Sequence, residues 1–155
     1  MRKQKSIGNK GFSLVELIIV IAIMAILIGV MAPQLMRYVE RTRVSADTQV
    51  ADSVRTAVTT AMMDPVVIAA GDNSVPAAGT TLNLATAADF PGAFGGSVAE
   101  TLGYADVATM TAGIIGELQS DGATGITATI DATGNRVTVE ITGSDDGTGN
   151  PITVE

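Results

Sequence analysis

The sequence lacks cysteine, histidine and tryptophan altogether. Without histidine and cysteine, the chain has neither the usual general base nor a thiol nucleophile, and it lacks the common zinc ligands. Residues 92–96 are rich in glycine but lack the Lys-Ser/Thr ending of a phosphate-binding loop, so we predict a turn there. The sequence predicts no catalytic, cofactor-binding or metal-binding residues, and an enzyme is the class of protein that it favours least.

One stretch near the C-terminus raises an alternative on metal binding. Residues 144–150 read Ser-Asp-Asp-Gly-Thr-Gly-Asn and offer oxygen atoms to a calcium ion, but they do not match an EF-hand loop. We therefore predict a polar hairpin turn in this stretch, with calcium binding as the less favoured alternative.

Basic residues are few and unevenly placed. The first eleven residues hold four of the nine basic side chains and none of the sixteen acidic ones, and no lysine follows Lys10. Residues 12–155 therefore combine five basic with sixteen acidic residues, a formal charge of −11 before the termini are counted. A surface this acidic repels phosphate groups, so direct nucleic-acid binding is not expected.

A long apolar run begins close to the N-terminus. No side chain is charged between Leu17 and Met36, and Ile, Leu, Val, Met and Ala dominate the run. A helix of this length measures about 30 Å, which is enough to cross the hydrocarbon core of a bilayer. We therefore predict a membrane-inserted helix, and the charges on its two flanks favour a cytoplasmic N-terminus by a narrow margin.

Glu16 lies at the start of this run, where a carboxylate is costly unless it reaches the headgroups or finds a cation. It is either a tolerated boundary residue or a functional carboxylate that needs a positive partner. No lysine or arginine follows before Arg37, so the cation within reach is an N-terminal amine, created by a cut just before Phe12. Such an amine on a neighbouring subunit would neutralise Glu16 in an apolar interior and set the axial register of the two helices.

The leader and the start of the apolar run together resemble the signature of type IV prepilins. A short basic leader ends in Gly11, Phe12 stands where the mature N-terminus would be, and Glu16 follows at the spacing that the family uses. Pro33 matches the helix-breaking proline of the family. The resemblance covers roughly residues 1–40.

The resemblance implies a maturation pathway. A prepilin peptidase would cut between Gly11 and Phe12 at the cytoplasmic face, and the new amine of Phe12 would be N-methylated. The subunit would wait in the cytoplasmic membrane, and the pilus assembly machinery would then extract it into a helical surface filament of copies of itself. Phe12 and Glu16 would be the assembly residues.

The segment from Gly29 to Pro33 is a weak point in this helix. Pro33 cannot donate a hydrogen bond to the carbonyl of Gly29, and glycine is a weak helix former. Two alternatives stay open: a plain kink, or a segment that extends or melts during assembly, as the resemblance suggests.

Several functional alternatives remain beside the pilus subunit. The family also includes type II secretion pseudopilins and competence pseudopilus subunits, which the leader motif does not separate from pilins. A signal-anchored surface protein that binds a ligand as a monomer is an alternative of another class. A cleaved secretory signal is disfavoured. Residues 30–32 resemble a signal-peptidase cleavage site, but Pro33 would directly follow the cut, and the apolar run is longer than in usual secretory signals.

Beyond Arg37 the sequence becomes amphipathic. Apolar residues recur at helical steps, with charged and polar side chains, Asp47 among them, spread between them. The predicted core-facing positions are Val39, Ala46, Val50, Val54, Ala57 and Ala61. We expect this helix to end near Met63, because a residue that precedes proline is pushed out of helical conformation.

The remaining residues predict a small head. Residues 65–97 look like a long irregular connection, a short helix is expected within 104–118, and alternating patterns predict strands at 126–130, 136–141 and 152–154. The predicted fold class is α+β, with a long N-terminal helix packed on a small C-terminal antiparallel sheet, in agreement with the pilin resemblance. The expected divisions are a cleaved leader 1–11, a membrane or filament-core helix 12–36, its amphipathic half 37–63, and a head 64–155.

Overall fold

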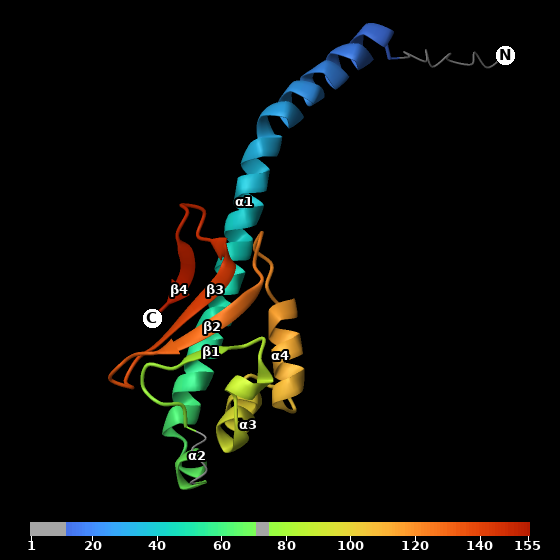
Figure 1. Cartoon of the computed structure of the whole chain (residues 1–155). Coiled ribbons are helices and arrows are strands. Elements are labelled where there is room, and N and C mark those ends of the chain that lie inside the picture. The colour runs from blue at the N-terminus through green and yellow to red at the C-terminus, as the bar shows by residue number, and fades with distance from the viewer. Residues whose placement is uncertain (1–11, 71–74) are drawn as a thin grey trace, which may run out of the picture. The chain divides into compact units, whose positions relative to one another are not determined.

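The computed structural model describes residues 12–70 and 75–155 (Figure 1). The chain forms two compact units, the first ending at Tyr38 and the second beginning at Val39. The fold class is α+β, as predicted: a long N-terminal helix, α1 (Leu14–Met63), is followed by short helices and a four-stranded antiparallel sheet.

The first unit consists of the apolar part of α1. Its side chains are exposed along the whole length of this part, including large apolar ones such as Ile18, Leu27 and Met36. By length and composition, α1 is the one helix in the described residues that could cross a membrane. The predicted long apolar helix is therefore present, and its large apolar side chains are exposed.

In the second unit, α1 contributes one face to the core. Its buried residues are Asp47, Ala51, Val54, Ala57, Val58 and Ala61. The prediction was correct for Val54, Ala57 and Ala61 but wrong for Val39, which is exposed, while Ala46 and Val50 are only half-buried. The buried face begins later in the sequence than the apolar pattern indicates.

Helix α1 ends just before Pro65, as the sequence predicted. Met63 is the last residue of α1, and Asp64 caps a second short helix, α2 (Pro65–Ala69), by accepting a hydrogen bond from the Val66 N–H at 2.8 Å. Pro65 occupies the first turn of α2, where its missing N–H costs nothing.

The prediction of an irregular connection over residues 65–97 was wrong. This stretch holds α2, a short strand β1 (Thr81–Asn83), a 3-10 turn η1 (Ala87–Asp89) and the start of α3 (Gly92–Thr101). Part of the predicted connection, residues 71–74, lies outside the described residues. Glycine and proline made the stretch look like a loop, but packing against the core orders it.

The turn predicted at residues 92–96 was also wrong, because these residues form the first half of α3. Phe94 is fully buried there, and its ring stacks on that of Phe90 with centroids 6.1 Å apart. A Cβ atom on Gly95 would lie 2.1 Å from the carbonyl oxygen of Phe90. The glycine therefore permits close approach of α3 to the preceding segment instead of marking a turn.

The helix expected within residues 104–118 is α4 (Val107–Gly116). Asp106 caps it, accepting a hydrogen bond from the Thr109 N–H at 2.8 Å, while the Thr109 hydroxyl accepts one from the Asp106 N–H at 3.2 Å. This reciprocal capping box fixes the start of a helix whose glycines weaken it.

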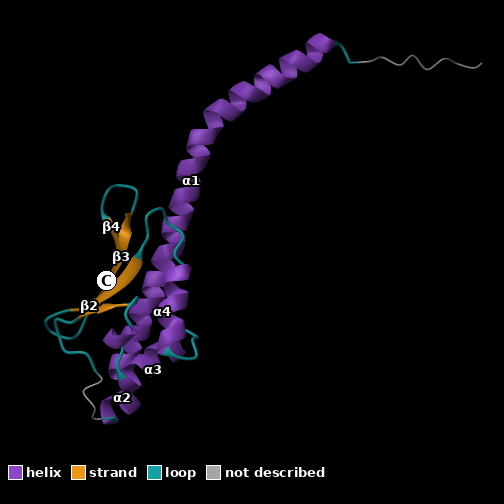
Figure 2. Ribbon diagram, turned by 45° about the vertical axis from the view of Figure 1, so that its right-hand side comes forward, coloured by secondary structure: helices purple, strands orange, loops and turns teal. Residues whose placement is uncertain are grey.

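The sheet confirms the predicted C-terminal meander, whose strands are orange in Figure 2, and adds one strand, β1, which is labelled in Figure 1. Strands β2 (Gly125–Ile130), β3 (Val137–Asp145) and β4 (Pro151–Val154) pair antiparallel in chain order, and β1 pairs with β2 at the other edge. Ile126, Val139 and Ile152 from these strands share one core cluster with Val54 and Ala57 of α1. The core of the head therefore lies between the sheet and the second half of α1.

Candidate assembly segment and head contacts

The N-terminal end of α1 carries the residues singled out from the sequence. Phe12 is 89% exposed, and Ser13 directly precedes the helix. The Ser13 N–H donates a hydrogen bond to Oε2 of Glu16 at 3.0 Å. Glu16 is therefore held by the N-terminus of its own helix, where a negative charge is favourable.

This local role of Glu16 was missed at the sequence level, although a signal was present. Ser13 and Glu16 have the spacing of a capping box, in which the third helical residue reaches back to the N-cap N–H. Gly11, on the other side of the predicted cleavage point, lies outside the described residues. The carboxylate of Glu16 thus bonds to the residue that follows Phe12, whereas the peptide bond to be cut lies outside the described residues.

Gly29 and Pro33 both lie inside α1, which is assigned as helical throughout residues 14–63. A Cβ atom on Gly29 would meet no other atom within 4 Å, so the glycine is not required by packing inside the subunit. The predicted kink or melting of this segment stays a prediction.

A buried carboxylate joins α1 to the connection between α4 and β2. Asp47 is fully buried, and its carboxylate accepts hydrogen bonds from the Gln119 N–H at 2.8 Å and from the Ser120 N–H at 2.9 Å. It also accepts a bond from the Ser120 hydroxyl. The sequence pattern set Asp47 among the charged and polar side chains between the core-facing positions, and it gave no sign of burial, because the backbone donors that satisfy the carboxylate lie 72 and 73 residues away.

A second carboxylate of α1 holds the same connection two turns earlier. Oε1 of Glu40 accepts a hydrogen bond from the Asp121 N–H at 2.7 Å, and Oε2 lies 3.4 Å from the Arg43 guanidinium. Glu40 and Asp47 are seven residues apart, so both point to the same side of α1. Together they fix residues 119–121 on the helix, which positions the entry into β2.

The tight turns of the head are also fixed by carboxylates. Hydrogen bonds from the Thr133 hydroxyl and then from backbone N–H groups hold the pKa of Asp131 below its ordinary value. In the β3–β4 turn, hydrogen bonds from the Thr148 hydroxyl and N–H lower the pKa of Asp146 in the same way. Because these hydrogen bonds favour the charged form of the carboxylate, they hold each aspartate in the conformation of its own turn.

The polar hairpin predicted at residues 144–150 is confirmed. The Asp146 N–H donates to the Asn150 carbonyl at 2.8 Å, and Oδ1 of Asp145 accepts from the Gly147 N–H at 2.7 Å. Within residues 12–70 and 75–155, no three acidic side chains are grouped so that they could hold a metal ion.

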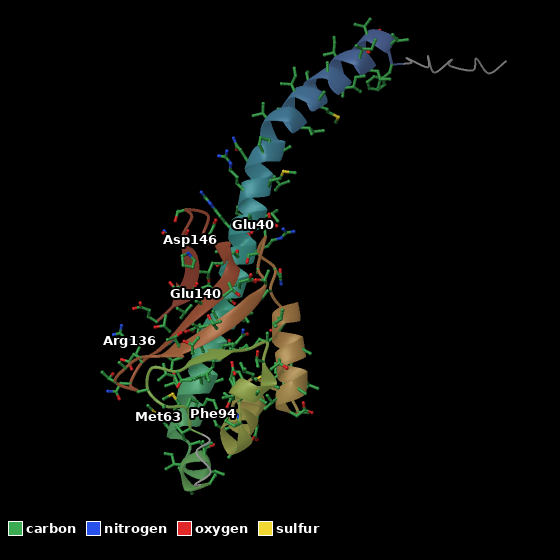
Figure 3. All side chains as sticks on the ribbon, viewed as in Figure 1. Glu40, Met63, Phe94, Arg136, Glu140 and Asp146 are labelled. Carbon is green, nitrogen blue, oxygen red and sulfur yellow. The ribbon has the colours of Figure 1, made fainter. Side chains whose placement is uncertain are left out.

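The two ends of the sheet differ in what they present. Figure 3 shows Asp146 and Glu40 toward one end of the head and Arg136 toward the other. Arg136 follows the β2–β3 turn and pairs with Glu155 at 3.3 Å. Asp146 belongs to the β3–β4 turn. The residues on either side of it, Asp145 and Gly147, line a groove together with Glu40.

Comparison with known proteins identifies similarities over part of the chain. A family model described as the prokaryotic N-terminal methylation motif matches residues 8–32. The type IV major fimbrial protein FimA of Dichelobacter nodosus is 41% identical over 56 residues, which cover 36% of this chain and 36% of that protein. A second FimA of the same organism is equally similar over 36% of this chain and 35% of its own length. The match therefore spans about a third of these relatives, and no solved structure matches the chain.

Proposed function

We propose that this chain is a structural subunit of a type IV pilus, polymerised through α1. The proposal is supported by the similarity of its N-terminal segment to a methylation motif and to type IV fimbrial proteins. One combined observation carries this proposal. A methylation motif at residues 8–32 leads into a helix whose apolar part is exposed along its whole length. A surface of this kind must be covered by lipid or by other protein.

The proposed maturation begins in the cytoplasmic membrane. A prepilin peptidase removes residues 1–11, and the new amine of Phe12 is N-methylated. The motif match spans the proposed cleavage point and supports this step. Until assembly, the apolar part of α1 is covered by lipid and the head lies outside the cytoplasm.

Assembly then moves the apolar helix from lipid into the filament core. In the free subunit, the carboxylate of Glu16 accepts a bond from its own Ser13 N–H. In the filament, the Phe12 amine of a neighbouring copy approaches the same carboxylate and neutralises it in a low-dielectric interior. The segment from Gly29 to Pro33 adjusts the course of the helix, because its backbone hydrogen bonding is already weakened there.

Two other functions are compatible with the same motif. A type II secretion pseudopilin or a competence pseudopilus subunit would be processed in the same way but would form short structures. A signal-anchored monomeric surface protein would keep its leader and form no polymer. The exposed apolar helix is compatible with all three, but the identity with major fimbrial proteins favours a pilus.

The deciding experiment is mass spectrometry of protein sheared from the surface of native cells. We expect a chain that begins at N-methylated Phe12, recovered in high-molecular-weight filaments. A chain that keeps any of residues 1–11 would contradict processing and favour the anchored monomer. A processed chain that is absent from sheared material would contradict the pilus and favour a short pseudopilus.

A further inference from the structure

Two of the five arginines that follow the leader have no ionic partner within the subunit. Arg37 and Arg41 form no ion pair or side-chain hydrogen bond with another described residue. They are four residues apart in α1, a spacing that brings two side chains to the same side of a helix. The other three each pair within the chain, in Arg43–Glu40, Arg55–Asp52 and Arg136–Glu155.

Negative charge gathers on a different surface of the head. A groove of about 430 Å³ is lined by Glu40, Asp121 and Asp145, and the rest of its lining is small or neutral residues of the β3–β4 turn region. The carboxylate of Asp121 is exposed and has no hydrogen bond or ion pair with a described residue, since only its backbone N–H is engaged, by Glu40.

The arginines and the groove include neighbouring residues of the sequence, but they form no ion pairs with each other within the described part of one chain. Glu40 lines the groove, and the next residue, Arg41, pairs with none of its three carboxylates. The charges that the two surfaces leave unpaired are opposite, so the groove of one copy can neutralise the arginines of another.

We propose that the Arg37–Arg41 face of α1 docks against the acidic groove of a second copy of this chain. The inference rests on the proposed function and names a contact within the filament. Each subunit offers a cationic surface and a separate anionic one, so the interface is heterologous, the kind that builds an open helical array when it does not close into a ring. Because residues 12–155 carry a formal charge of −11, neighbouring heads repel unless such a contact offsets the repulsion.

Anionic lipid headgroups attract the same arginines while the subunit waits in the membrane. Binding to lipid and binding to the groove can be distinguished. Binding to lipid requires the arginines before assembly and does not depend on Asp121. Binding to the groove requires the arginines during assembly and depends on the charge of Asp121.

The test uses full-length chains in native cells that lack the wild-type copy. Wild type is compared with Arg37→Glu/Arg41→Glu, with that variant plus Asp121→Arg, and with the matched control Arg136→Glu, whose arginine pairs with Glu155 at the far end of the sheet. For each chain, the processed subunit in the membrane and the subunit in sheared filaments are both quantified.

We expect the double reversal to lower the filament fraction at least tenfold while processed subunit accumulates in the membrane. Adding Asp121→Arg should restore filaments at least in part, and Arg136→Glu should assemble like wild type. Filaments of wild type should also dissociate more readily as salt is raised.

Three results would overturn the docking. They are normal assembly of the double reversal, no recovery on adding Asp121→Arg, and a loss of membrane-bound precursor with an unchanged filament fraction, which assigns the arginines to lipid. If wild type itself yields no filament, the proposed function fails, and this outcome is distinct because the first comparison alone reveals it.

Discussion

The carboxylate of Asp47 accepts a hydrogen bond from the Ser120 N–H at 2.9 Å, across 73 positions of the chain. Asp47 is fully buried in a face of α1 that otherwise contributes only alanine and valine to the core. Apolar contacts are not directional, so they fix the position of a connection less sharply than a hydrogen bond does. A polar contact of fixed geometry therefore sets where the α4–β2 connection lies on α1.

Replacing Asp47 with alanine should lower the stability of the head substantially. The change leaves the N–H of buried Ser120 and the N–H of the more exposed Gln119 without this acceptor. Loss of the acceptor of a buried donor costs about 1–3 kcal/mol. We expect the free energy of unfolding to fall by about 3 kcal/mol in denaturant titrations of the detergent-solubilised chain.

Asp52→Ala is the matched control for this experiment. Asp52 lies on the same helix but pairs only with Arg55 at the surface, 2.9 Å away. Its removal should cost no more than about 1 kcal/mol. Equal losses in the two variants would show that Asp47 has no special role.

Two adjacent glycines of α3 should respond in opposite directions to alanine. In Gly95→Ala the new Cβ would lie 2.1 Å from the Phe90 carbonyl oxygen and 2.9 Å from Cγ2 of Val107, so backbone must move. Such overpacking costs about 1–3 kcal/mol. In Gly96→Ala the Cβ meets no atom within 4 Å, and the better helix former should raise stability by up to about 1 kcal/mol.

Thermal unfolding of the two glycine variants beside wild type checks this prediction. A lower melting temperature for Gly95→Ala with an unchanged or higher one for Gly96→Ala is expected. The reverse order would mean that α3 does not approach Phe90 as closely as the structure shows.

The cap of α4 should make stability depend on acid pH. Hydrogen bonds from the Thr109 N–H and hydroxyl hold the pKa of Asp106 below its ordinary value of 3.8. The folded state therefore binds fewer protons than the unfolded state in this range. The contribution of the charged cap is complete above the unfolded pKa and is lost as pH falls through the folded pKa.

Asp106→Asn isolates this contribution, because asparagine still caps a helix but does not titrate. We expect the denaturation midpoint of wild type to fall more steeply than that of the variant as the pH is lowered from 5 to 2, about the range in which carboxylates titrate. Parallel curves would show that the cap gains nothing from its charge.

The sequence predicts most strongly where one pattern dominates locally. The apolar run, the end of α1 before Pro65 and the alternation in β2 and β3 each follow from a short stretch of residues, and all three are present in the structure. The methylation motif is likewise local, which is why Phe12 and Glu16 could be singled out without a structure.

The errors occur where distant packing decides. Residues 92–96 look like a turn because their helix-breaking glycine is needed for close contact with Phe90. The burial of Asp47 could not be predicted, because the donors that satisfy its carboxylate lie in a connection far along the chain. Strand β1 was missed because its three residues pair with β2, 48 positions later at Thr81–Thr129.

Glu16 offers the last prediction, in which two substitutions separate two roles. Glu16→Gln keeps an oxygen that can accept the Ser13 N–H, and Glu16→Ala removes it. Neither can neutralise the Phe12 amine of a neighbouring subunit. If charge pairing drives assembly, both variants should be cut and N-methylated at Phe12 but should yield at least tenfold less sheared filament than wild type.

The amounts of processed subunit and of sheared filament distinguish the possibilities. Poor assembly of Glu16→Ala with normal assembly of Glu16→Gln would assign Glu16 to capping α1, since the amide can replace the carboxylate as an acceptor but not as a charge. Normal piliation in both would remove Glu16 from assembly altogether. Because cleavage occurs before assembly, a fault in processing would appear as retained residues of the 1–11 leader and would not be confused with either result.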